Sequence, residues 1–503
     1  MALLVSFFVD LLIALITLGV LLALYMKQCH TYWQRRGVPT LPGHWLFGNI
    51  KDVVMQKNSA GMVIGELHNQ ASEDDDVLGI YILHKPYLLI RSPELIKQIL
   101  VKDFNNFPDR FFTARSFRDK IGSSNLFTIQ NPEWRYLRTK ITPVFTSGKM
   151  KRVCELIAET SDCMSKYLEA EFSHGTKTKV LPMKEIAMKY TTDIISSVAF
   201  GIKVNSFDSD KTKFYDQAQE GVRLTLYRSI RLTIMFFFPK IAPYLGGQFL
   251  GSSTNYFRQV FWDSFHSREK SNIKRGDLID SLIDLKSGEQ EKQLKFEGDV
   301  LVSQAAIFFV AGRESSVTTI SMSLYELAKN PTIQKRAREE IREKLAQHGM
   351  TYEGIQSMKY LQQIMSETLR LYPPAPLLDR VAVNDYKIPG TDIVIEKGTP
   401  IYVALCGIHR DPRYFPDPLR YDPDRFSDEN KDNIKACTYM PFGEGPRICI
   451  GARLGTLQSA MGIIPVLKDY EVSLDPTYKG RYVDGRNIFI VPEEGFRLKL
   501  TKL

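Results

Sequence analysis

The sequence predicts a mainly α-helical protein with a minor β portion and a transmembrane helix at its N-terminus. Three observations support this fold class. Residues 1–26 are almost wholly apolar. Apolar residues recur at helical spacing from about Pro93 onward. Strand-like runs with turn residues between them occupy residues 77–83, 87–90, 386–403 and 488–500.

The N-terminal segment is predicted to cross a membrane. Asp10 is the only charged residue among residues 1–26, and a helix of this length spans a hydrocarbon core of roughly 30 Å. Lys27, Arg35 and Arg36 follow it and no cation precedes it, which places the rest of the chain in the cytosol. A cleaved signal peptide fits less well, because the first residues lack positive charge and no small-residue cleavage site is evident.

Residues 27–43 are basic and proline-rich, and we expect them to form a stiff hinge. Pro39 and Pro42 fix φ and oppose a helix. Tyr32 and Trp33 are the aromatic residues that we expect at the membrane interface.

Composition limits the class of partner and the compartment. The formal net charge of +9 over 503 residues suits an anionic membrane surface or an acidic protein partner, and no basic low-complexity arm indicates nucleic acid. The cysteines lack paired spacing, which argues against a disulfide framework and for a reducing compartment. They are Cys29, Cys154, Cys163, Cys406, Cys437 and Cys449.

A helix is predicted over residues 299–329, roughly 46 Å long and ended by Asn330-Pro331. Gly312 costs about 1 kcal/mol relative to alanine in mid-helix, and a ligand pressed against the backbone would explain it. Glu314 beside Ser315 places an acid next to a hydroxyl, a pair that can relay protons. A solvated glutamate and an ordinary helix serine explain the same residues equally well.

Residues 441–451 present one cysteine, Cys449, in a Gly/Pro-rich loop before an apolar helical run. Gly443, Gly445 and Gly451 allow positive φ and close approach of a bulky planar group, and N–H groups at the helix start favour a thiolate. A dinucleotide fingerprint is weak because Ile448 stands where its third glycine belongs. Zinc would require further Cys or His in paired spacing. His409 is a poor rival ligand, because its loop has no glycine to admit a porphyrin.

Phe442, Gly445, Arg447, Cys449 and Gly451 match every specified position of the F-x-x-G-x-R-x-C-x-G signature, so the chain resembles the cytochrome P450 family. The resemblance implies that the family's fold surrounds a buried haem b, with residues 44–503 as one catalytic domain. It also implies that Cys449 is the axial thiolate of the iron, that Phe442 packs near the sulfur, and that Arg447 binds a haem propionate. Such a thiolate pushes electron density onto iron and favours O–O cleavage.

Further motifs of the same family match elsewhere. Residues 311–316 resemble its oxygen-activation motif, with Ser315 in place of the usual threonine. Trp134 and Arg138, at helical spacing, resemble a propionate-binding pair, and Arg380 stands where the family has another propionate ligand. Glu367, Arg370 and Arg425 resemble its structural E-x-x-R and P-[ED]-R-F network, which implies a role in folding and haem retention.

Family position also suggests which residues line a greasy substrate pocket. They are Phe111, Phe127, Phe308, Phe309, Ala311, Leu377, Leu378 and Phe489.

The resemblance implies an oxidoreductase that inserts one oxygen atom of O2 into a lipophilic molecule. It is nearest to insect microsomal enzymes that oxidise foreign compounds, which implies an endoplasmic reticulum membrane protein; endogenous lipids, steroids or hormones are the other substrates considered. Electrons would come from NADPH through NADPH-cytochrome P450 reductase, with cytochrome b5 as a second candidate donor, because the chain has no flavin or nicotinamide fingerprint. The alternatives are a haem-thiolate isomerase or dehydratase, and a non-catalytic haem protein.

Overall fold

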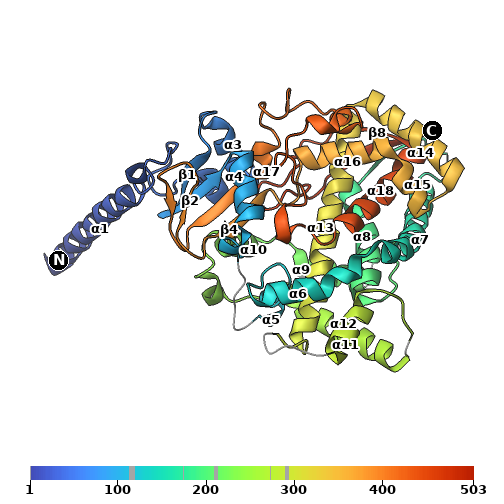
Figure 1. Cartoon of the computed structure of the whole chain (residues 1–503), viewed down its shortest axis with the longest axis horizontal. Coiled ribbons are helices and arrows are strands. Elements are labelled where there is room, and N and C mark those ends of the chain that lie inside the picture. Colours follow the sequence, from blue (N-terminus) through green and yellow to red (C-terminus); the bar gives the residue numbers. More distant parts are fainter. Residues whose placement is uncertain (1, 113–118, 174, 209–212, 272, 289–293) are drawn as a thin grey trace.

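The computed structural model describes residues 2–503 except 113–118, 174, 209–212, 272 and 289–293. The fold class predicted from the sequence, a mainly α-helical body with a minor β portion, is confirmed. Figure 1 shows α1 projecting from this body, with β1, β2 and β4 in the part of the body nearest to it.

The helices follow one another along nearly the whole described chain. They are α1 (Ala2–Cys29), α2 (Lys51–Val54), α3 (Ala60–Gln70), α4 (Pro93–Lys97), α5 (Lys120–Ser123), α6 (Glu133–Ile141), α7 (Ser147–Glu171), α8 (Met183–Phe200), α9 (Lys213–Val222), α10 (Leu226–Phe237), α11 (Thr254–Ser271), α12 (Leu278–Ser287), α13 (Asp299–Lys329), α14 (Pro331–His348), α15 (Tyr352–Ser357), α16 (Lys359–Leu371), α17 (Leu405–Ile408) and α18 (Ala452–Asp469). The strands are β1 (Val77–Ile82), β2 (Lys85–Ile90), β3 (Thr178–Leu181), β4 (Leu377–Val381), β5 (Tyr386–Lys387), β6 (Val394–Ile395), β7 (Pro400–Ala404), β8 (Tyr470–Leu474) and β9 (Leu498–Lys502).

Helix α13 is the axis of the body, and its predicted bounds are confirmed. It packs against α8, α16 and α18, and Figure 1 shows it running through the middle of the molecule. Its neighbour α14 starts at Pro331, where the missing N–H costs no hydrogen bond. A helix buried on several sides presents its middle residues to the protein interior, which is where the candidate site lies.

The sheets are small and join distant parts of the chain. Strands pair in the order β1-β2-β7-β4, β3-β9-β8 and β5-β6. In the first sheet β2 runs parallel to β7, with Leu88 opposite Ile401, whereas β4 runs antiparallel to β7. The sequence predicted β1 and β2 but not β3, β4 or β8, and of the predicted run 488–500 only the end forms β9.

The segment after α1 is attached to the first sheet. Trp33 is fully buried, and its ring lies where a Cβ on Gly79 of β1 would stand. The prediction that Trp33 lies at a membrane interface is therefore wrong. Tyr32 is half-buried and donates a hydrogen bond to the Glu396 carboxylate at 2.8 Å.

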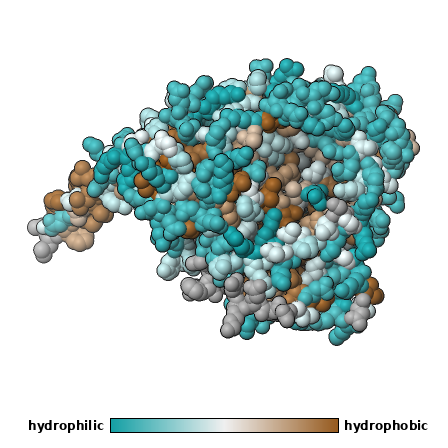
Figure 2. Space-filling model, viewed as in Figure 1, coloured by the Kyte–Doolittle hydropathy of each residue, from teal (hydrophilic) through white to brown (hydrophobic). Residues whose placement is uncertain are grey.

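Among the residues that the structure describes, two helices are long and apolar enough to cross a membrane, and they differ in burial. In the helix at residues 4–36, none of the most apolar 18-residue stretch is buried, whereas 56% of the corresponding stretch of α13 is buried. Figure 2 shows the apolar α1 extending from a body whose visible surface is mostly hydrophilic. Helix α1 is thus the candidate membrane anchor and α13 is a core helix.

Candidate active site

One large cavity lies beside the middle of α13, opposite the loop that carries Cys449. Its volume is about 470 Å³, and its walls include α6, α10, β4 and the start of α18. The Cys449 side chain is exposed to this cavity. The cysteine and the acid–hydroxyl pair predicted from the sequence therefore face one space.

The loop before Cys449 has the shape that its glycines permit. Gly443 and Gly445 have φ of +80° and +73°, and a Cβ on Gly445 would lie 2.0 Å from the Leu100 carbonyl oxygen. The Cys449 N–H donates to the Phe442 carbonyl at 2.8 Å, which fixes the direction in which the cysteine leaves the loop.

Gly451 differs from the prediction, because its φ is −94°. Because Gly451 has no side chain, it leaves open space at this position instead. A Cβ on Gly451 or on Gly455, one turn later, would meet no atom within 4 Å, and both residues line the cavity. The start of α18 therefore offers a bare backbone surface on which a flat group can lie.

The Cys449 thiol is placed between opposing electrostatic effects. Burial raises its pKa, whereas a hydrogen bond involving the Gly451 backbone and the positive charges of Arg138 and Arg110 favour the thiolate. A bound cation at the sulfur would add to the second group of effects.

Four arginines line the cavity around the cysteine, with fewer carboxylates beside them. Arg447 pairs with Asp109 at 3.2 Å and Arg110 with Asp379 at 3.1 Å. Arg138 and Arg380 have no ion-pair partner among the described residues, and the Arg380 Nε is buried without a hydrogen-bond acceptor.

Burial and this excess of positive charge lower the pKa values of two of these arginines. Burial, followed by repulsion from Arg110 and Arg380, lowers the pKa of Arg447 to about 8. Burial and repulsion from Arg110 lower that of Arg380 to about 9. Arg380, which is buried, and Arg138, which is half-buried, have no carboxylate partners and fit the two propionates of a haem, whose ring the glycine surface of α18 would accept.

Trp134 and Arg138 lie on α6, and both line the cavity. The Trp134 ring also holds Arg447, whose guanidinium carbon lies 4.1 Å from the ring centroid. Arg110 is the one cavity arginine of this group that the sequence did not indicate, since nothing in the spacing of a lone arginine after Pro108-Asp109 marks it as a ligand.

The acid–hydroxyl pair faces the same cavity from α13. The Ser315 hydroxyl donates to the Ala311 carbonyl at 2.7 Å. The Glu314 carboxylate pairs with Arg313, which is fully buried and also donates to Thr192 at 2.8 Å. A Cβ on Gly312 would lie 2.7 Å from the Ile195 side chain of α8, so the glycine allows two helices to pack closely. Gly312 also lines the cavity, so a ligand against its backbone stays a prediction.

The predicted structural network is assembled behind the cysteine loop. Arg370 donates two hydrogen bonds to Glu367 at 2.7 and 2.8 Å, and both side chains are fully buried. Arg425 lies 3.6 Å from the same carboxylate. Arg370 also donates to the His409 carbonyl, and His409 Nε2 accepts from the Met440 N–H at 3.0 Å.

These contacts exclude His409 as a metal ligand. Its ring nitrogens are used by Met440 and by the Arg370 carbonyl, and it does not line the cavity. Among the described residues no group of three or more His, Cys, Asp and Glu side chains could hold a metal ion.

Six of the eight residues predicted to contact substrate line the cavity. They are Phe127, Phe308, Ala311, Leu377, Leu378 and Phe489. Phe309 instead lies in the core against Phe200 and Phe257, and Phe111 packs on Tyr87, so these two predictions are wrong. Phe112, which was predicted only as part of the segment between Phe111 and Phe127, lines the cavity in place of its neighbour. Family position suggests this whole segment for substrate contact, and its residues 113–118 lie outside the described residues.

Comparisons with known proteins agree with this geometry. A family model described as Cytochrome P450 matches residues 38–500. Cytochrome P450 6k1 of Blattella germanica is 42% identical over 484 residues, covering 92% of this chain and 91% of that protein. Cytochrome P450 6j1 of the same species is 34% identical, covering 99% and 98%. Cytochrome P450 6d3 of Musca domestica is 35% identical, covering 98% and 99%.

Proposed function

The chain belongs to the cytochrome P450 family and is a haem-thiolate monooxygenase, and we propose that it takes electrons from NADPH through a separate reductase and oxidises small lipophilic molecules. The observation that carries this proposal is the position of Cys449. Its side chain opens into a cavity lined by aromatic side chains and by arginines, of which Arg138 and Arg380 have no ion-pair partner among the described residues.

The residues that would hold haem b follow from the site. Cys449 would supply the thiolate ligand, Arg138 and Arg380 would neutralise the propionates, and Arg447 and Trp134 would support them. Phe442 would pack beside the sulfur. When bound, the haem supplies an iron that activates O2, with the thiolate favouring O–O cleavage.

Protons reach the site past Glu314 and Ser315 in this proposal. Glu314 is an acid held in place by Arg313, and its side chain is 30% exposed. The Ser315 hydroxyl is a donor and an acceptor that faces the cavity. Together they offer exchangeable protons on the side of the cavity formed by α13.

Residues 1–26 anchor the protein in the endoplasmic reticulum membrane in this proposal, residues 27–43 connect the anchor, and residues 44–503 form the cytosolic catalytic domain. The reductase, and cytochrome b5 as a second donor, dock on basic residues near the cysteine loop. The candidate docking residues are Arg135, Lys140, Lys149, Lys151, Arg152 and Arg453. Most of their side chains are exposed, although Lys151 pairs with Glu353.

The substrates that we propose are foreign compounds such as plant toxins or insecticides, with endogenous lipids, steroids or hormones as the second group. The test is purified protein with reductase and NADPH, offered a panel of lipophilic compounds, with products identified by mass spectrometry. We expect products one oxygen atom heavier that require NADPH. Turnover without NADPH would point to an isomerase or dehydratase, and binding without any product would point to a non-catalytic haem protein.

A further inference from the structure

Helix α10 lines the cavity with a face that changes character along its length. Its cavity residues are Arg228, Arg231, Leu232, Met235 and Phe236, which recur at helical spacing. The first two are cationic and the last three are apolar. At 1.5 Å rise per residue, this face extends for about 12 Å.

The opposite face of α10 is apolar and exposed. Leu226, Tyr227 and Ile230 are 65%, 58% and 48% exposed. A helix on a soluble protein normally turns its charges outward and its apolar residues inward. The inward arginines of α10 therefore need a reason other than solubility.

Arg231 has no carboxylate partner among the residues that the structure describes. Its two terminal nitrogens donate to the carbonyls of Gln248 and Gly247, each at 3.0 Å, and its Nε is buried without an acceptor. Burial lowers the pKa of Arg231, with Asp119 as the main opposing charge. Burial also lowers the pKa of Arg228, to about 10.

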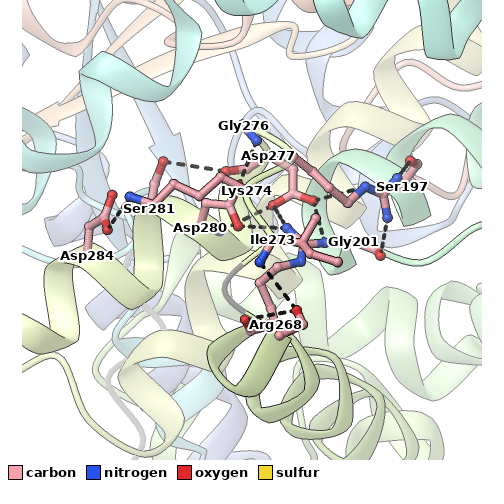
Figure 3. A network of polar contacts seen from close by, with 12 residues as sticks. Ser197, Gly201, Arg268, Ile273, Lys274, Gly276, Asp277, Asp280, Ser281 and Asp284 are labelled. Carbon is pink, nitrogen blue, oxygen red and sulfur yellow. Dashed lines mark hydrogen bonds and ion pairs between the residues drawn. The ribbon is translucent and has the colours of Figure 1, made fainter.

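The arginines of this chain differ in how far their donors are used: Arg110 and Arg380, which line the cavity, also have a buried Nε without an acceptor, whereas Arg268 and Arg91 do not. Figure 3 shows Arg268 between Asp277 and Asp280, to which it donates at 3.1 and 2.7 Å. Arg91 binds only carbonyls, but its Nε donates to the His68 carbonyl at 3.1 Å and it does not line the cavity. Arg231 combines a cavity position, the lack of an ion pair among the described residues (Asp119 acts on it only from a longer distance) and an unused donor, and a loop support needs none of these.

The haem propionates do not account for Arg231. The charges that act on Arg447 and Arg380 come from Arg110, Asp109 and Asp379. Those that act on Arg231 come from Asp119 and Tyr227. Arg228 and Arg231 also lie on α10, whereas Arg380 lies on β4 and Arg138 on α6, so the cavity has a second cationic group on α10 that is left for another ligand.

We propose that Arg231, assisted by Arg228, binds the carboxylate of an amphiphilic substrate, a carboxylic acid with an unbranched apolar chain of about ten carbons or more. The apolar chain of this substrate lies along Leu232, Met235 and Phe236. The Phe236 ring in turn packs on Phe112 and Phe489, with centroids 4.4 and 5.6 Å apart. This proposal rests on the proposed function for the reaction, but concerns which molecule the cavity binds.

Binding at equilibrium tests this proposal without turnover. The haem-loaded full chain in nanodiscs is titrated calorimetrically with dodecanoate, methyl dodecanoate and dodecylamine, with blank titrations into empty nanodiscs. A hydrogen bond to a charged group contributes about 1.5–3 kcal/mol, so we expect dodecanoate to bind at least about tenfold tighter than its ester. Equal affinity of acid, ester and amine would overturn the proposal.

Variants separate recognition from loop support. Arg231→Gln keeps donors for the carbonyls of Gly247 and Gln248 but removes the charge, and we expect about tenfold weaker binding of dodecanoate with the ester nearly unchanged. Arg223→Gln is the matched control: Arg223 is 67% exposed, pairs with Glu220 at 3.7 Å and does not line the cavity. We expect it to bind all three ligands as the unmodified protein does.

Arg231→Glu gives a result that a structural role cannot mimic, because it should lose dodecanoate and gain dodecylamine. The carbon monoxide spectrum of the reduced protein verifies that each variant still holds haem. If Arg231→Gln folds and binds dodecanoate as before, the arginine only supports the loop and the proposal fails. Failure of the proposed function would appear differently, as normal ligand binding without any NADPH-dependent product.

Discussion

The two ends of the cavity are built in different ways. At Cys449 the backbone is fixed by positive-φ glycines, by the Leu100 carbonyl against Gly445, and by buried arginines. At α10 the wall consists of aromatic contacts such as Phe112–Phe236, and its arginines donate to loop carbonyls. The Cys449 end fixes the positions of individual atoms, whereas the α10 end constrains mainly the size and polarity of the ligand. Substitutions should therefore be far more damaging at the first end than at the second.

Replacement of the cysteine gives the largest expected effect. Cys449→Ser keeps the size of the side chain but exchanges a thiolate for a hydroxyl, so we expect activity to fall below about one thousandth and the strongly red-shifted carbon monoxide band to disappear. Absorption spectra and haem content per chain measure both.

Cys437→Ser is the matched control for this substitution. Cys437 is buried in a different cluster and does not line the cavity, so its variant should keep the band. A Cys449→Ser protein that keeps the carbon monoxide band and the activity would show that Cys449 is not the haem ligand.

The support behind the cysteine loop gives the next largest effect. Arg370→Ala leaves the Glu367 carboxylate buried without its bidentate partner, which costs roughly 3–5 kcal/mol, and also removes the bond to the His409 carbonyl. We expect little soluble haem-loaded protein and a much lower midpoint of thermal unfolding.

Arg425→Ala serves as the comparison for that variant. Arg425 lies 3.6 Å from Glu367 and is partly exposed, so its loss should cost about 1 kcal/mol. Equal unfolding midpoints for the two variants would mean that the buried pair does not maintain this end of the cavity.

Two neighbouring phenylalanines sharpen the contrast within α13. Phe309 is fully buried among Phe200, Phe214 and Phe257, so Phe309→Ala should cost roughly 3–5 kcal/mol of stability. Phe308 lines the cavity beside Phe145, so Phe308→Ala should change ligand affinity several-fold with little loss of stability. Thermal unfolding and ligand titration on both variants separate the two effects, and a reversed order would contradict the assigned orientations.

The same contrast explains what the sequence could and could not predict. Cys449 and its loop were predictable because the chemistry of a haem thiolate demands particular residue types at fixed spacing. The bounds of α13 were predictable because Asn330-Pro331 ends one helix and starts another. Apolar lining carries no such signal, since the side chains of Phe308 and Phe309 are identical and α13 is apolar around most of its circumference.

Strand β4 and Arg110 were missed for related reasons. Strand β4 is buried on both faces and carries Asp379 and Arg380, so its sequence lacks the alternation of a half-exposed strand. Arg110 is identified only by what the fold brings to it, namely Asp379 and Arg380.

Ser315 gives the smallest expected effect and lies between the two ends. Its hydroxyl donates to the Ala311 carbonyl, and serine lacks the methyl that restricts χ1 in threonine. Ser315→Thr should hold the hydroxyl in a narrower range of positions and raise product formed per NADPH, about twofold at most if the freer rotamer costs a few tenths of a kcal/mol. Ser315→Ala should lower that ratio, with the difference leaving as hydrogen peroxide. Product, peroxide and NADPH are measured in the same reaction, and equal ratios for all three proteins would remove Ser315 from proton delivery.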